Sequence, residues 1–172
     1  MRCRRLVVGP RRARARPHRA LAARSLGEQN TAKGAQAAAE TRLTIRHDLP
    51  GRFGNRDHVA LGPRLYLLES KNFYDSEVTL EGEARRVCRI DQPDDSYLLD
   101  RLTAPMERRA RNLWNELRQS ADLRTYVHPV IVLWARFPQK RVAVRGAPYV
   151  DGHELARWLE EQPAELSEAR RV

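Results

Sequence analysis

Residues 56–71 read as a β-hairpin whose two faces are both apolar, because two short apolar runs flank the turn signal Gly62-Pro63. A three-residue turn centred on Pro63 predicts three cross-strand pairs, namely Leu61 with Leu65, Val59 with Leu67, and Asp57 with Glu69. Since side chains alternate along a strand, each face of this hairpin buries its own apolar set. The first set is Val59, Leu61, Leu65 and Leu67, and the second is Ala60, Tyr66 and Leu68. The charges at the open end therefore lie at the margin of a core, where unpaired ions are costly.

Asp57 and Glu69 form the chemically informative pair at this open end. Two carboxylates directly across a strand pair repel each other and destabilise the sheet. The pair becomes favourable around a hard divalent cation, because Mg²⁺ prefers carboxylate and water oxygens. Lys71 shares the face of Glu69 and offers a positive charge where a phosphodiester would bind. The pattern indicates metal-dependent phosphodiester hydrolysis; the alternative is a surface hairpin with one salt bridge.

The remaining pattern predicts an α/β domain, and 172 residues fit one such unit. Helices are expected over an alanine-rich segment at 26–41, over 105–120, and after a capping residue at Asp151. Strands are expected at 43–49, in a second hairpin within 77–90, in the continuous apolar run at 128–135, and at 142–144. This order favours a mixed β-sheet with helices on both faces.

The net charge of +10 is concentrated at the start of the chain. Residues 1–24 contain nine arginines and no acid; removing those nine from the 32 Lys plus Arg leaves 23 basic residues against 22 acids. Such a block is expected to be disordered, and it can bind polyanions without sequence preference. An ordinary solvated tail, or upstream sequence wrongly included in the chain, remains an equal alternative.

Composition argues against several other classes of protein. The apolar stretch at 6–8 is too short for a signal peptide, and no run approaches the ~18 apolar residues of a membrane span. Cys3 and Cys88 suggest neither a disulfide framework nor a zinc site. The expected location is the reducing cytoplasm, with no membrane association.

Several motifs together resemble the nuclease-related domain (NERD) family, a branch of the PD-(D/E)XK nuclease-like superfamily. They are Gly27-Glu28, His47-Asp48-Leu49-Pro50, the stretch from Gly54-Asn55-Arg56-Asp57-His58-Val59 to Gly62-Pro63, and Glu69-Ser70-Lys71-Asn72. The resemblance covers roughly residues 26–160. It differs at Arg56, where the family usually has an aliphatic residue, in a shorter turn, and in lacking a glutamine around 104–108.

The resemblance implies a restriction-endonuclease-like mixed β-sheet flanked by helices over residues 26–162, between a basic tail (1–25) and a short C-terminal tail (163–172). It implies that Asp57 and Glu69 bind Mg²⁺ or Mn²⁺, with Glu28 as a third carboxylate. Lys71 would orient the attacking water or stabilise phosphate charge. Glu28 is equally well explained as a solvent-facing charge on its helix.

Nucleic acid, with DNA favoured over RNA, is the implied partner, and four residues are candidates to contact it: Asn72, Arg108, Arg111 and Arg118. The three arginines form a polar stripe on the helix at 105–120, where a merely solvated face is the favoured alternative. Asn72 either contacts phosphate or caps a loop. Phe73 and Tyr74 are placed to stack on a nucleotide, whereas the three tryptophans and His58 are expected to pack in the protein interior.

Three functions remain open at this point. The first is a divalent-metal-dependent nuclease, the second a non-catalytic nucleic-acid-binding module that keeps the fold, and the third a structural or regulatory partner domain. Because many nucleases pair to cut two strands, a homodimer is a further expectation.

Overall fold

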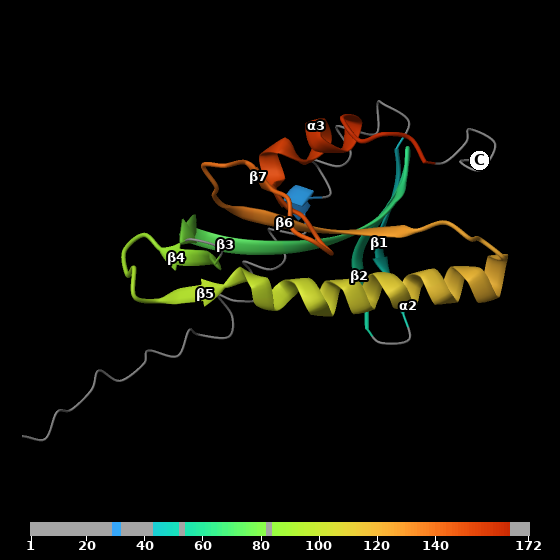
Figure 1. The fold of residues 1–172 in the computed structure, drawn as a ribbon, viewed down its shortest axis with the longest axis horizontal. Coiled ribbons are helices and arrows are strands. Elements are labelled where there is room, and N and C mark those ends of the chain that lie inside the picture. Colours follow the sequence, from blue (N-terminus) through green and yellow to red (C-terminus); the bar gives the residue numbers. More distant parts are fainter. Residues whose placement is uncertain (1–28, 32–42, 52–53, 82–83, 166–172) are drawn as a thin grey trace, which may run out of the picture.

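The computed structural model describes residues 29–31, 43–51, 54–81 and 84–165 of the chain (Figure 1). Residues 29–31 are helical, within the helix expected at 26–41. The rest of that helix, the basic tail and Glu28 lie outside the described residues.

The described residues form a mixed eight-stranded sheet flanked by helices, which confirms the predicted α/β class. The strands are β1 (Thr44–Leu49), β2 (Arg56–Leu61), β3 (Leu65–Glu81), β4 (Ala84–Arg89), β5 (Ser96–Leu98), β6 (Val127–Arg136), β7 (Arg141–Val142) and β8 (Tyr149–Asp151). The helices are η2 (Leu99–Leu102), α2 (Thr103–Ala121), η3 (Gly152–Glu154) and α3 (Leu155–Glu160). The main path is β1-β2-β3-β6-β8-β7, and β4 joins β3 to β5.

The predicted hairpin is present, and two of its three predicted cross-strand pairs are confirmed. The recorded pairing of β2 with β3 ends at His58 opposite Leu68, so it does not include the third predicted pair, Asp57 with Glu69. β2 and β3 are antiparallel, with Leu61 opposite Leu65 and Val59 opposite Leu67. The backbone N–H of Gly62 donates to the carbonyl of Arg64 (3.0 Å) and closes the turn.

β3 is longer than the sequence pattern suggested. It continues through Asn72 to Glu81, so Asn72 lies within a strand and does not cap a loop, which corrects one of its two readings. The second half pairs with β4 in the hairpin predicted within 77–90. A register shift relative to β6 between Asn72 and Glu77 contains Asp75 at φ 54°, and lets one strand serve both hairpins.

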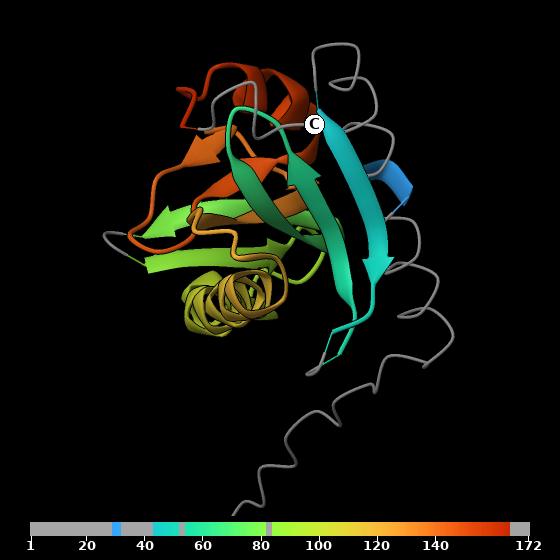
Figure 2. The ribbon, with the colours of Figure 1, turned by 90° about the vertical axis from the view of Figure 1, so that its right-hand side faces the viewer.

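Two hydrophobic clusters sandwich the sheet. α2 covers one face and α3 the other (Figure 1), and the view along the sheet shows the curvature of β1 to β3 (Figure 2). Because side chains alternate along a strand, β6 contributes residues to both hydrophobic clusters. Ile131 and Leu133 belong to the cluster with α2, whereas Val130 and Val132 belong to the cluster with α3. The prediction that this apolar run is covered on both faces is confirmed.

The end of the chain adds a strand that the sequence analysis did not identify. β8 runs parallel to β6, with Val132 opposite Val150. Asp151 then caps η3, where its carboxylate accepts a hydrogen bond from the backbone N–H of His153 (3.0 Å), as its predicted capping role requires. The strand expected at 142–144 is instead Arg141–Val142.

Leu133→Ala should lower the free energy of unfolding by about 2–5 kcal/mol, because it removes a fully buried side chain from the centre of β6. Leu80→Ala is the matched control: Leu80 also lies in a strand but is 43% exposed, and less than about 1 kcal/mol should be lost. Urea unfolding of both variants measures the difference. Equal losses would contradict the assigned core.

Candidate phosphodiester-binding site

Asp57 is a buried carboxylate at the start of β2. Its residue is 6% exposed, and its Oδ2 accepts a hydrogen bond from the backbone N–H of Ser70 in β3 (3.1 Å). Strand alternation places Asp57 on the same face as Val59, which packs in the cluster with α2. The side chain therefore points to the α2 side of the sheet at the junction of β2 and β3.

Glu69 lies on the same side of the sheet, in the strand next to Asp57. Its Oε1 accepts a hydrogen bond from Nζ of Lys71 (2.6 Å), and its Oε2 pairs with the guanidinium of Arg109 from α2. The Glu69 side chain is 14% exposed, so its charge is largely removed from water and needs these cations. The structure thus brings Glu69 and Lys71 together as predicted and adds Arg109.

A second ion pair ties α2 to the same edge of the hairpin. Arg56, directly before Asp57, pairs with Glu116 on α2 and also donates to the Pro50 carbonyl (3.2 Å). Arg109 and Glu116 are seven residues apart and therefore lie on one flank of α2. Together with Gly54, Asn55 and Asn112, these three side chains line a small recess beside the site. The arginine that departs from the family pattern thus has a structural role here.

The face opposite Glu69 is fixed by hydroxyl groups. The Ser70 hydroxyl lies 2.8 Å from Oγ1 of Thr31, which accepts a hydrogen bond from the indole N–H of Trp134 (2.7 Å). All three residues are linked across segments distant in sequence. This network holds β3 in place behind the candidate site.

His58 packs in the interior, as expected. It is 3% exposed, and its Nδ1 lies 2.7 Å from Nδ1 of His47 on β1. The pKa of His58 is lowered from 6.5 to about 4, chiefly by burial and also by the neighbouring His47, while Asp48 and Glu69 act in the opposite direction. His58 is therefore neutral at pH 7, and it packs behind the candidate site without facing it.

The residues predicted to contact nucleic acid have separate positions. Arg108, Arg111 and Arg118 are exposed on α2, and Arg118 lies 5.4 Å over the ring of Trp114. Asn72 is half-buried in β3, beyond Lys71. Of the proposed stacking residues, Tyr74 is 75% exposed, whereas Phe73 packs 6.0 Å from the ring of Tyr97.

The donor set of the site suits a hard cation in part. Asp57 and Glu69 supply carboxylate oxygens, the ligands that Mg²⁺ and Mn²⁺ prefer. Across the described ranges, however, no cluster of three or more His, Cys, Asp or Glu side chains could hold a metal. Both oxygens of Glu69 already bind cationic side chains. A metal would therefore have to displace Lys71 or Arg109 from one oxygen.

Arg109 was not identified as a site residue by the sequence analysis. Helical spacing from the apolar positions Met106, Ala110 and Leu113 does place Arg109 at the edge of the buried face. The strand residue that Arg109 contacts depends on how α2 docks on the sheet, and the local sequence pattern does not specify this docking. The available signal was Glu69 itself, an acid expected at the margin of the core, where a second basic partner besides Lys71 could have been sought.

No protein-family model, curated protein or solved structure matches the chain. In the part of the chain that the structure describes, no helix combines the length and apolar character needed to cross a membrane.

Acidification should destabilise the protein through His58. Its pKa is about 4 when folded and 6.5 when unfolded, so the unfolded state binds more protons between these values and stability falls as the pH drops through this window. The wild type should lose on the order of 2–3 kcal/mol more between pH 7 and 4 than His58→Phe, which cannot titrate. Denaturant unfolding at both pH values measures this; parallel losses in the two proteins would contradict the assignment.

Proposed function

We propose that this chain is a nuclease-like domain of the NERD type that hydrolyses phosphodiester bonds in nucleic acid, with DNA as the favoured substrate, using a divalent metal ion. The observation that carries the proposal is the placement of Asp57 and Glu69 on one face of adjacent strands, beside Lys71 and Arg109. Two acidic and two basic side chains close together suit an anionic substrate and a cationic cofactor. Two cysteines without a framework fit a cytoplasmic location for this activity.

Each residue has a distinct role in this proposal. Asp57 and Glu69 would hold Mg²⁺ or Mn²⁺, with Glu28 as a candidate third ligand. The ion, when bound, supplies Lewis-acid polarisation of the phosphoryl group and lowers the pKa of a bound water. Lys71 and Arg109, released from Glu69, would offset the charge that builds up on the phosphate. Ser70 contributes its backbone N–H to hold Asp57 in position.

The ion pairs of Glu69 also favour a second candidate function. A carboxylate whose two oxygens each bind a cationic side chain is already satisfied without metal. The same domain would then bind nucleic acid without cleaving it, through its exposed arginines and its basic tail. We keep this non-catalytic binding module as the alternative.

Cleavage of plasmid DNA in Mg²⁺ or Mn²⁺ tests the first function. Asp57→Asn and Glu69→Gln should each lower the rate by roughly 100-fold or more, because each removes a charged group that binds the metal. Asp94→Asn is the matched control, since Asp94 is exposed in the loop before β5 and should leave the rate unchanged. Calorimetric titration with Mn²⁺ should show heat of binding for the wild type and none for Asp57→Asn.

Cleavage that survives both site substitutions would indicate a contaminant and would overturn the proposal. Absence of Mn²⁺ binding and of cleavage, with nucleic-acid binding retained, would establish the alternative. Absence of all three would leave a structural or regulatory domain.

The alternative function predicts a strong salt dependence that resides in the first 24 residues. Deleting them should weaken duplex DNA binding and reduce the slope of log K against log salt by roughly 0.9 for each arginine that had contacted a phosphate. Fluorescence anisotropy across a salt series measures both quantities. An unchanged slope would show that the tail does not bind.

A further inference from the structure

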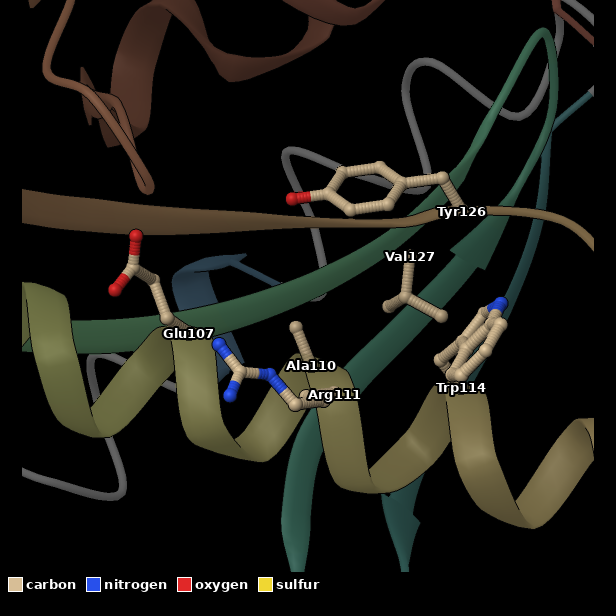
Figure 3. A pocket seen from close by; sticks show the side chains of 6 residues that line it. All are labelled: Glu107, Ala110, Arg111, Trp114, Tyr126 and Val127. Carbon is tan, nitrogen blue, oxygen red and sulfur yellow. The ribbon is translucent and has the colours of Figure 1, made fainter.

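A groove of about 350 Å³ lies between α2 and the start of β6. It is lined by Glu107, Ala110, Arg111, Trp114, Tyr126 and Val127. In Figure 3 the ring of Tyr126 lies along β6 and Val127 points toward α2, while Glu107, Arg111 and Trp114 rise from the helix. The volume lies within the range of about 300–1,000 Å³ typical of small-ligand sites.

Tyr126 presents an exposed ring that contacts His128. It is 60% exposed, and its ring meets the edge of His128 at 4.7 Å between centroids and an angle of 81°. Nε2 of His128 lies 2.7 Å from a carboxylate oxygen of Glu165. An aromatic surface that is braced and still open to solvent suits stacking on a planar ligand.

Trp114 forms the second aromatic wall of the groove. It is half-buried and packs against the cluster under α2, so its position is set by the core. The guanidinium of Arg118 lies 5.4 Å over its ring and adds positive charge at the rim. The expectation that this tryptophan belongs wholly to the core is therefore incomplete.

The groove is lined by one cation, Arg111, and one anion, Glu107, whose carboxylate packs against Gly146 in the space that a Cβ would occupy. Neither Arg111 nor Glu107 forms an ion pair with another residue in the described ranges. Arginine recognises phosphate, and a carboxylate accepts hydrogen bonds from an exocyclic amino group such as that of cytosine. A planar ring, an amino group and a phosphate together describe a nucleotide.

The position of the groove indicates a polymer. Residues 107, 111 and 114 share one flank of α2, whereas Arg109, which binds Glu69, lies on the other flank. Arg108 and Asn115 are exposed on the outward ridge between the two flanks. A single-stranded nucleic acid that runs from the groove to the candidate site would cross this ridge, and its phosphates would lie close to Arg108.

We propose that this groove binds one base of a single-stranded nucleic acid, stacked on Tyr126 beside Trp114, with the adjoining phosphate on Arg111. The inference rests on the proposed function for its substrate class and adds where the strand is held. Glu107 gives the groove a preference for bases that carry an amino group.

The test is anisotropy binding of a labelled oligo(dC) to the full chain in a metal-free buffer with chelator. Tyr126→Ala should weaken binding roughly 5- to 100-fold, the loss expected for one stacked base. Tyr126→Phe keeps the ring and should bind like the wild type. Because the side chain is exposed, neither change should alter the unfolding midpoint.

An abasic oligomer of equal length is the matched ligand control. It should bind the wild type more weakly by a similar factor and should not distinguish Tyr126→Ala from the wild type. Arg111→Gln should weaken both oligomers, since it removes a phosphate contact, whereas Arg101→Gln, an exposed arginine outside the groove, should weaken neither.

Equal affinity of the wild type for the two oligomers, or unchanged affinity of Tyr126→Ala for oligo(dC), would overturn the proposal that the groove binds a base. Deoxycytidine monophosphate binding as tightly as oligo(dC) would overturn the polymer assignment in favour of a mononucleotide site. Cleavage that is lost in Asp57→Asn but unchanged in Tyr126→Ala would support the proposed nuclease function and contradict the proposed role of the groove. Binding that depends on the base, without any cleavage, would support the groove and contradict the nuclease function.

Discussion

The parallel pairing of β3 with β6 is the constraint on which the rest of the structure depends. Where Leu65–Leu68 of β3 run beside Val127–Leu133 of β6, the two strands are covered on both faces, so side chains there are apolar or paired with an opposite charge. Glu69 is paired with Ile131 in this central ladder. A carboxylate at such a position is unfavourable unless cations reach it, and Lys71 and Arg109 do so.

This compensation links architecture to the proposed chemistry. The Arg109 and Arg56 ion pairs both join α2 to the β2–β3 hairpin, and they therefore fix the helix over the site as well as neutralising charge. A purely structural design would be served equally well by apolar residues of similar size. In the proposed function, these ion pairs have a second role, because an anionic substrate and a cationic cofactor could exchange with them.

The sequence predicted those parts of the fold that are locally encoded. The hairpin register followed from the turn at Pro63 and from strand alternation, and β6 followed from its apolar run. β8 was missed because its three residues become a strand only through pairing with β6. For the same reason, the sequence indicated Glu69 and Lys71 as neighbours, since they share one strand face, but did not reveal Arg109 or Tyr126. Docking of α2 brings Arg109 to Glu69 and places Trp114 along the same groove as Tyr126, and no local pattern encodes how the helix docks.

The two flanks of α2 differ in how completely the fold satisfies their charges. On the flank facing the hairpin, Arg109 is bound to Glu69, so an incoming phosphate must compete with a carboxylate for it. On the flank facing the start of β6, Arg111 has no such competitor among the described residues. A phosphate at Arg111 would therefore bind without first separating an ion pair, as a phosphate at Arg109 would have to do. Taken together, the two proposals imply that a nucleic-acid strand would engage the groove first, and that the raised local concentration of phosphate would favour exchange of the ion pairs at Glu69.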